Sequence, residues 1–400
     1  MSDRKLYVGL DIRNDITQIA VLDPSRIEPD VLELGDEGAG IPTEVAIPGS
    51  GERIRDFMKK IHCQEAIYAD GRESDPVNIL AAFLRKTLSL TKKKYPRESI
   101  KGLVVTTEYR DFRLITTIYR ALEKLGIDKD RALVVDRRQS YIYYVLSQKR
   151  ELWVNQVGMF DFGSGHLDYY QMDTDRSRRP ALVRVATKNY GDYAELFNGN
   201  EQSEEEKASI FEGMVQGAIH GHIITSLYMT GPGFADGFAE DVMKKLCVGR
   251  HLFIGDNLYV CGACYMAKEF GGAGTNKEFV YVSEDTVSSN ILIRAYADAK
   301  AQDVLLVRAG TVWYHIDYEL DLIPDGDQEL ELCVQNVVTK ERMMHMIPME
   351  GIYGRTERKA RVGIQIRFAG ADRCIVTLRD KGFGEFFPSS YRIWEETITI

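Results

Sequence analysis

Apolar strands and amphipathic helices alternate along the first 270 residues. Residues 5–23 form two apolar, β-branched runs around a polar turn at residues 13–15, which is the pattern of a β-hairpin. Asp75-Pro76 predicts the start of a helix, because Asp caps a helix and Pro fits its first turn. The other elements expected here are strands at 41–48, 102–107 and 132–136, and helices from about 111 and near 139–149. Continuous apolar strands between such helices predict an α/β sheet covered on both faces.

The pattern starts again at residue 157 with a second hairpin. Asp11 and Asp161 stand at the ends of the two first strands, and Asp23 and Asp173 at the ends of the two second strands. Both offsets are 150 residues, so the sequence predicts an internal duplication. The elements expected next are strands near 181–187, 223–231 and 252–253, and helices near 203–220, from about 235 and from about 257.

A different pattern begins near residue 289, where the helical spacing has faded. Val362, Ile364, Ile366 and Phe368 recur with a period of two, which is typical of an antiparallel strand with one buried face. We therefore expect a separate C-terminal antiparallel β domain. The domains expected are 1–150, 151–275 and 289–400.

Composition narrows the classes of partner. The chain has 51 Lys plus Arg against 60 Asp plus Glu, a formal charge of −9, which disfavours nucleic acid and anionic lipid. No stretch approaches the roughly 18 uncharged apolar residues that a membrane span requires. The six cysteines are scattered, which fits reduced thiols better than a disulfide framework. We expect a cytoplasmic protein with neither a nucleic-acid nor a membrane partner.

The repeated strand-Asp-turn-strand unit carries the candidate chemistry. Tight turns aim backbone N–H groups at phosphate oxygens, glycine allows close approach, and an Asp at each strand end can hold a metal through water. Gly163-Ser164-Gly165 suits the phosphate role in the second unit, and Gly231 and Gly233 lie between a strand and a helix, where amides favour an anion. Ordinary hairpin and βα turns explain the same residues.

Four segments together resemble the actin, sugar-kinase and heat-shock ATPase superfamily, and their order is most similar to the seventy-kilodalton heat-shock chaperones. YVGLDIRNDITQIAVLD resembles the first phosphate loop and MFDFGSGHLDYYQMD the second. MTGPGFADGFAEDVMKKL is similar to the adenosine loop, and GDNLYVCGACYMA to the closing helix. The resemblance covers about residues 1–270. The tail GFGEFFPSSYRIWEETITI also resembles that of a bacterial branch of chaperone-like proteins.

The resemblance implies a duplicated actin-like (ribonuclease H-like) ATPase fold followed by a β-sandwich that takes the place of the chaperone substrate domain. Only about forty residues separate Lys188 from Thr230, so the upper lobes are expected to be reduced. ATP or ADP with magnesium would lie between Asp11 and Asp161, which would hold the metal. Closure of the two lobes around the nucleotide would then alter how the β domain binds a protein or peptide client. The nucleotide-binding residues implied are Asp11, Arg13, Asn14, Arg137, Asp161, Gly163, Ser164, Gly165, His166, Gly231 and Gly233.

Three departures from the family pattern bear on catalysis. The first loop presents Arg13, Asn14 and Asp15 in place of a glycine and paired threonines. The position of a catalytic-site carboxylate carries Arg137, and His166 replaces a hydroxyl residue. No catalytic residue is assigned, and hydrolysis, if any, would be weak. Arg137 could instead neutralise phosphate charge, giving binding without turnover.

Three alternatives to the nucleotide-dependent chaperone-like protein stay open. The first is a pseudo-ATPase, an interaction scaffold that binds nucleotide weakly or not at all, which the altered first loop and Arg137 favour. The second is an actin-like filament former, which the small upper lobes favour and the appended β domain disfavours. The third is a small-molecule kinase.

Overall fold

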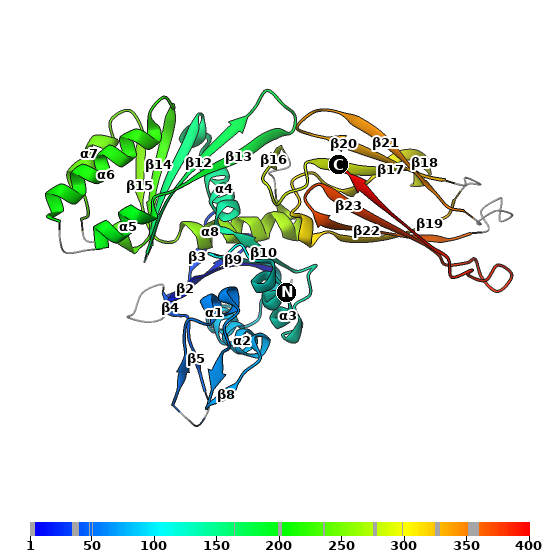
Figure 1. Ribbon diagram of the computed structural model, residues 1–400, viewed down its shortest axis with the longest axis horizontal. Coiled ribbons are helices and arrows are strands. Elements are labelled where there is room, and N and C mark those ends of the chain that lie inside the picture. Colours follow the sequence, from blue (N-terminus) through cyan, green and yellow to red (C-terminus); the bar gives the residue numbers. More distant parts are fainter. Residues whose placement is uncertain are drawn as a thin grey trace. The chain divides into compact units, whose positions relative to one another are not determined.

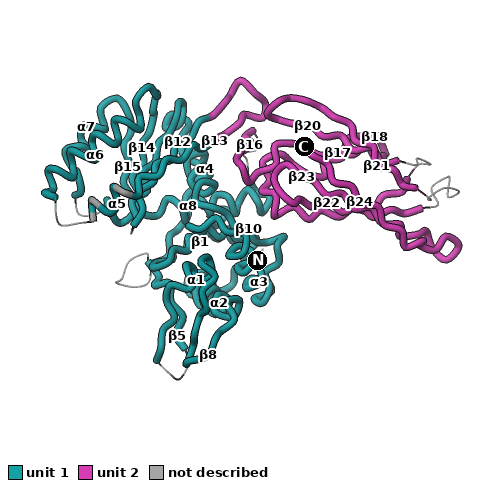
Figure 2. The backbone as a smooth tube through the Cα atoms, viewed as in Figure 1, with its two compact units in different colours: residues 1–173, 185–276 teal, residues 174–184, 277–400 magenta. Residues whose placement is uncertain are grey.

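The chain divides into two compact units, residues 1–173 with 185–276 and residues 174–184 with 277–400 (Figure 2). The structure is a computed structural model. It describes residues 5–33, 40–47, 49, 51–163, 165–198, 202–234, 237–274, 278–297, 299–324, 329–350 and 360–400. The fold is mixed α/β and ends in a region of antiparallel sheets, as the sequence predicted.

The first sheet of the first unit has the strand order β10-β9-β1-β2-β3, with β4 also pairing with β2. Its strands are β1 (Lys5–Ile12), β2 (Ile16–Leu22), β3 (Asp30–Val31), β4 (Ile41–Pro42), β9 (Ser99–Thr107) and β10 (Ala132–Asp136). The helices are α1 (Phe57–Cys63), α2 (Pro76–Lys94), α3 (Phe112–Lys124) and α4 (Arg137–Ser147) (Figure 1). Two small hairpins also form, β5 (Val45–Ala46) with β6 (Arg53–Ile54) and β7 (Tyr68–Ala69) with β8 (Arg72–Glu73).

The second sheet has the order β15-β14-β11-β12-β13-β16. Its strands are β11 (Gln156–Gly163), β12 (His166–Asp175), β13 (Ala181–Asn189), β14 (Ile224–Thr230), β15 (His251–Ile254) and β16 (Phe279–Tyr281). The start of β13 and all of β16 belong to the second unit, where they pair in parallel. The helices are α5 (Gly191–Asn198), α6 (Glu204–Ile219), α7 (Glu240–Leu246) and α8 (Leu258–Lys268).

The strand pairing repeats, and the two hairpins have the offset seen in the sequence. β1 pairs antiparallel with β2 and parallel with β9, and β11 pairs antiparallel with β12 and parallel with β14. Tyr7 faces Leu22 and Val157 faces Met172, which are positions 150 residues apart in both strands. The parallel register shifts directly before Tyr7 in β1 and directly before Val157 in β11.

Helices α4 and α8 pack against each other in the middle of this unit (Figure 1). Helix α8 follows the second sheet in the chain but lies on β1, β2 and β9 of the first. Helix α4 follows the first sheet, and its Tyr141 donates a hydrogen bond of 2.8 Å to the carbonyl of Val157 in β11. A Cβ at Gly262 would lie 1.9 Å from the carbonyl oxygen of Ser140, so glycine is what permits this close helix contact.

The other face of the second sheet has its own core. Phe160, Leu167 and Leu227 of the sheet pack with Phe211 of α6 and Leu246 of α7. Aromatic rings dominate this core, because they bury large apolar areas between the strands and the helices.

Most of the second unit is formed by two four-stranded antiparallel sheets, in the orders β18-β17-β20-β21 and β19-β22-β23-β24. The strands of the first are β17 (Ser289–Ala297), β18 (Lys300–Val307), β20 (Glu329–Asn336) and β21 (Arg342–Pro348), and those of the second are β19 (Asp317–Leu322), β22 (Val362–Gly370), β23 (Arg373–Asp380) and β24 (Ile393–Thr399). Side chains of both sheets share one hydrophobic core, including Ile293, Leu332, Ile364 and Val376.

Two local expectations were wrong. The helix expected from about residue 235 begins at Glu240, because Gly237 and Ala239 have positive φ angles of 79° and 50° that no helix accommodates. The strand expected at 41–48 is split into β4 and β5, since the backbone N–H of Thr43 donates to the carbonyl of Asp15 between them. No helix among the described residues is long and apolar enough to cross a membrane.

Candidate functional site

The two strand-end carboxylates, Asp11 and Asp161, lie buried at the ends of β1 and β11. Their exposed fractions are 0% and 2%. Asp11 faces Thr106 of β9, and Asp161 faces Thr230 of β14. The duplicated pattern therefore places one carboxylate at the same edge position of each sheet.

Arg137 lies between these carboxylates. It is the first residue of α4, whose N-cap Asp136 accepts a hydrogen bond from the backbone N–H of Gln139. Its Nη1 lies 3.2 Å from Oδ2 of Asp161, and its Nε lies 3.9 Å from Oδ1 of Asp11. Burial would lower the pKa of Arg137, but the charges of Asp161 and Asp11 raise it well above its ordinary value. The guanidinium is therefore a permanent buried cation.

Asp161 has two further partners. The hydroxyl of Tyr259, in the first turn of α8, donates a hydrogen bond of 2.7 Å to its Oδ2, and Nε2 of His166 lies 3.5 Å from its Oδ1. Burial would raise the pKa of Asp161, but Arg137, His166 and Tyr259 lower it to about 2. Asp161 is thus a carboxylate throughout the physiological range.

The first loop is tied to other elements. Arg13 donates from Nε to Oδ2 of Asp11 at 2.9 Å and from Nη2 to the carbonyl of Asp256 at 3.2 Å. Asn14, expected to contact nucleotide, donates to Asp56 and accepts from the backbone N–H of Lys59. Its side chain thus binds the start of α1 and does not join the cluster around Asp161, and it adopts no positive φ.

The glycines of the second and third turns pack against the protein itself. A Cβ at Gly163 would lie 1.9 Å from Cε1 of His166, so the imidazole rests directly on this glycine. Gly231 has a φ of +100°, and a Cβ there would lie 2.4 Å from the carbonyl oxygen of Phe162, while one at Gly233 would meet the Phe162 ring at 2.2 Å. Gly165 has a φ of +94° with no atom close to its Cβ position. Ser164 lies outside the described residues.

Two residues of the cluster were missed by the sequence analysis, Glu108 and Tyr259. Oε1 of Glu108 lies 3.8 Å from Nη1 of Arg137 and 3.4 Å from Nδ1 of His166. Glu108 directly follows the apolar strand β9, so its place at a strand end was a usable signal. The ring of Tyr259 lies 5.0 Å from the Arg137 guanidinium, a cation–π contact that nothing in the sequence marks.

The cluster contains as many carboxyl groups as basic side chains. It comprises the carboxylates of Asp11, Glu108 and Asp161, the guanidiniums of Arg13 and Arg137, and the imidazole of His166. Burial would lower the pKa of His166, but the adjacent Asp161 raises it, which favours the charged imidazole. The cluster therefore has no surplus cation with which to bind an anion.

Magnesium does not fit between Asp11 and Asp161 in this arrangement. Mg²⁺ requires near-octahedral oxygen ligands and keeps several waters. Each of the two carboxylates already has a guanidinium partner, and Arg137 occupies the space between them. Among the described residues, no group of three or more His, Cys, Asp and Glu side chains is placed to hold a metal ion.

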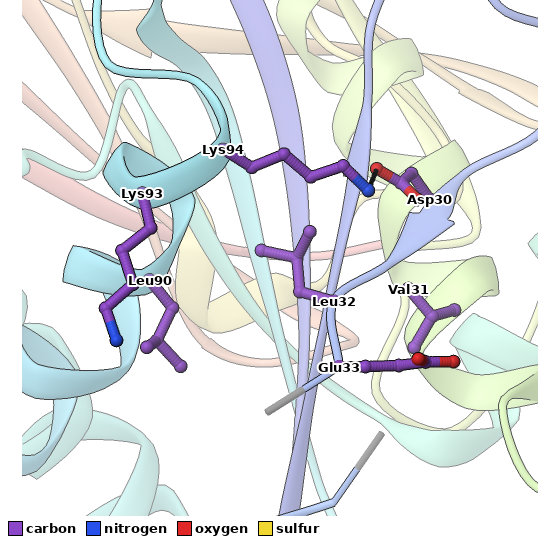
Figure 3. A pocket seen from close by; sticks show the side chains of 7 residues that line it. All are labelled: Asp30, Val31, Leu32, Glu33, Leu90, Lys93 and Lys94. Atoms are coloured by element: carbon purple, nitrogen blue, oxygen red, sulfur yellow. Dashed lines mark ion pairs between the residues drawn. The ribbon is translucent and has the colours of Figure 1, made fainter. Parts of the chain in front are cut away.

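A separate pocket of about 470 Å³ lies between β3 and the end of α2 (Figure 3). Lys94 forms an ion pair of 2.6 Å with Asp30, which also accepts a hydrogen bond from the hydroxyl of Tyr95. Burial and this carboxylate raise the pKa of Tyr95 to about 12. The sequence-predicted site residues do not line this pocket.

Two family models together match most of the chain. Residues 43–284 match the C-terminal model of a family of unknown function (DUF5716), and residues 286–400 match a domain of unknown function (DUF8552). The boundary between the two matched segments, at residues 284–286, lies close to residue 277, where the second segment of the second compact unit begins. None of the curated proteins compared matches the chain.

Proposed function

The chain belongs to the DUF5716 family of unknown function, and we propose that it is a chaperone-like interaction scaffold, a pseudo-ATPase. In this proposal a duplicated actin-like (ribonuclease H-like) fold with reduced upper lobes forms the first unit, and the C-terminal β unit binds a protein or peptide. The site that takes ATP in the resembled superfamily is occupied by the protein's own charges.

The repeated architecture supports the fold in this proposal. Both sheets have the same order of corresponding strands, and β1 and β11 pair in the same sense with their neighbours and share the register shift. The hairpins β1–β2 and β11–β12 are offset by 150 residues. The last helix of each repeat, α4 or α8, packs against the other helix and onto the opposite sheet.

One observation carries the functional proposal, the position of Arg137. A buried guanidinium 3.2 Å from Asp161 occupies the place that the resemblance assigns to magnesium. Moving it away would take the guanidinium partner from the buried carboxylate of Asp161, which is destabilising. A triphosphate would in addition bring negative charge to a cluster that has no surplus cation. The arrangement therefore favours a site that binds neither metal nor nucleotide.

Exposed aromatic side chains support protein binding by the second unit. In the connection between β23 and β24, Phe386 and Tyr391 are 91% and 89% exposed, and Phe383 is also exposed. Rigidly presented aromatic side chains are typical anchors of protein interfaces, because they bury a large area at a small cost in conformational entropy.

A nucleotide-dependent switch is the second candidate, and one observation favours it. Buried polar atoms at the cluster, Oδ1 of Asp11, Nε of Arg137, Nε2 of His166 and Oγ1 of Thr230, have no hydrogen-bond partner among the described residues. Such atoms could bind ATP or ADP with magnesium if Arg137 moved away from the carboxylates.

The melting temperature of the protein with and without millimolar ATP or ADP, in magnesium and then in EDTA, distinguishes the two candidates. A ligand at a hundredfold excess over its Kd stabilises the folded state by about 2.7 kcal/mol, which such a scan detects. We expect no shift with either nucleotide. A magnesium-dependent rise that is lost in Asp161→Asn would overturn the scaffold and support the switch.

Binding of reduced, unfolded α-lactalbumin tests the client function of the second unit. We expect binding that the double substitution Phe386→Ser, Tyr391→Ser abolishes. The matched control is Phe112→Ser, which removes an exposed phenylalanine from α3 of the first unit. No binding by the unaltered protein, or equal binding by all three proteins, would reject this part of the proposal.

A further inference from the structure

Polar contacts join the two repeats of the first unit at the cluster. The first repeat is the β1 sheet with α1–α4, and the second is the β11 sheet with α5–α8. Arg137 of the first repeat contacts Asp161 and Tyr259 of the second. Glu108 lies 3.4 Å from His166, and Arg13 donates to the carbonyl of Asp256 at 3.2 Å.

Arg137 makes the most deeply buried of these contacts. It is 6% exposed and Asp161 is 2% exposed, whereas the side chains of Glu108 and His166 are 26% and 22% exposed. Water screens a partly exposed ion pair, so it contributes little to stability, while loss of one partner from a buried pair leaves an uncompensated charge. Among these polar contacts, the Arg137–Asp161 pair therefore contributes most to holding the repeats together.

The helices hold the guanidinium in position. Arg137 and Ser140 lie one turn apart on α4, and Tyr259 and Gly262 lie one turn apart on α8. Arg137 faces Tyr259 in a cation–π contact, and one turn further along, the backbone of Ser140 faces Gly262. Because the second contact involves backbone atoms, α4 cannot slide along α8 without a clash.

We propose that Arg137 is an internal lock that holds the two repeats of the first unit at one fixed spacing. This inference rests on the proposed scaffold function, because a lock of this kind makes the spacing independent of nucleotide. The C-terminal unit is thereby attached to a first unit of constant shape.

Two native cysteines allow a direct measurement of the spacing. Cys63 ends α1 in the first repeat and Cys247 follows α7 in the second, and both are exposed, whereas Cys261, Cys264, Cys333 and Cys374 are buried. Spin labels attached to Cys63 and Cys247 therefore report the distance between the repeats by pulsed electron paramagnetic resonance.

We expect one narrow distance distribution for the unaltered protein and a broader or longer one for Arg137→Ala. The matched control is Arg138→Ala, since Arg138 is equally buried and donates to Asp136 of its own repeat. A distribution in Arg137→Ala equal to that of the unaltered protein would overturn the lock. Equal broadening in both variants would also overturn it, because the cause would then be damage to α4.

A second pair of variants covers the case in which Arg137→Ala does not fold. Arg137→Lys keeps the charge but loses the planar guanidinium, and Tyr259→Phe removes the hydroxyl that binds Asp161. We expect broadening in both, larger in Arg137→Lys, and unchanged distributions in both would reject the lock.

Adding ATP with magnesium to the labelled, unaltered protein separates failure of the lock from failure of the scaffold. We expect no change in the distance distribution. A nucleotide-dependent change would overturn both the scaffold and the lock. An unchanged distribution in Arg137→Ala, together with no nucleotide effect, would overturn the lock and leave the scaffold in place.

Discussion

The imidazole of His166 rests directly on Gly163, and a Cβ at residue 163 would lie 1.9 Å from its Cε1. The two residues face each other across β11 and β12, next to the turn that joins these strands. The absence of a side chain at Gly163 thus lets His166 reach both Asp161 and Glu108.

Gly163→Ala is expected to displace His166 and to lower the free energy of unfolding by about 1 kcal/mol, because the imidazole loses both carboxylates but can swing toward solvent. Urea denaturation of Gly163→Ala, His166→Ala and the double variant measures the energetic coupling between the two residues. We expect Gly163→Ala to cost much less in the His166→Ala background. Equal costs in both backgrounds would contradict the contact.

Gly262→Ala is expected to be more damaging, with a loss of about 3 kcal/mol or more, because its neighbour is a backbone carbonyl that cannot rotate away. Gly217→Ala in α6 is the matched control. A Cβ at Gly217 would meet no atom within 4 Å, so alanine should stabilise the helix by about 0.5 to 1 kcal/mol. Thermal melts of the two variants should therefore shift in opposite directions.

Arg137→Ala is expected to lower the free energy of unfolding by about 3 kcal/mol, since the buried carboxylate of Asp161 loses its guanidinium partner. Asp161→Asn combined with Arg137→Ala should cost clearly less than the sum of the two single substitutions. Chemical denaturation of the four proteins gives this coupling directly. If the losses in unfolding free energy of the two single substitutions simply added in the double variant, the 3.2 Å contact between Arg137 and Asp161 would contribute nothing to stability.

The spacing of apolar residues predicted most elements of the first unit, and the paired Asp residues predicted where its two sheets would bring carboxylates together. Asp75 caps α2 as predicted, and Asp111, near which a helix was expected to begin, caps α3. Local chemistry decides such features, so a single sequence contains them.

The partners of each cluster residue could not be predicted in this way. Asn14 binds α1, and Tyr259 reaches Asp161 across 98 positions of the chain, because the packing of distant elements sets both contacts. The late start of α7 depends on a positive φ at Ala239, which a residue with a Cβ rarely adopts and no pattern of apolar residues reveals. The position of the Arg137 side chain between the two carboxylates depends on how distant elements pack, and no local pattern in the sequence reveals it.

Stability should fall in acid in part because of Asp161. Its pKa is about 2 in the folded protein, below the value of about 3.9 for an unfolded Asp, so the stabilisation is present above pH 4 and is lost as the pH falls toward 2. The shift corresponds to about 2.6 kcal/mol, of which about 2 kcal/mol is lost between pH 5 and pH 2. We expect the difference in unfolding free energy between the unaltered protein and Asp161→Asn to shrink by about 2 kcal/mol over this range. If the difference in unfolding free energy between the two proteins did not change with pH, the pKa of Asp161 would be the same in the folded and the unfolded protein.

The exposed aromatic residues of the second unit depend on a buried carboxylate. Asp380, 5% exposed at the end of β23, accepts hydrogen bonds from the backbone N–H groups of Gly382 and Ser390 and from the Ser390 hydroxyl. Asp380→Ala should therefore cost about 1 to 3 kcal/mol and loosen the connection that presents Phe386.

Hydrogen–deuterium exchange of residues 381–392 measures this loosening. We expect faster exchange there in Asp380→Ala, whereas Phe386→Ser, which alters a side chain that is 91% exposed, should leave both exchange and stability nearly unchanged. Unfolded α-lactalbumin should then bind more weakly to both variants, for different reasons: Asp380→Ala loses the fixed presentation of the aromatic side chains, and Phe386→Ser loses one of the side chains itself. Exchange that stays slow in Asp380→Ala would show that the connection does not need this carboxylate to keep its shape.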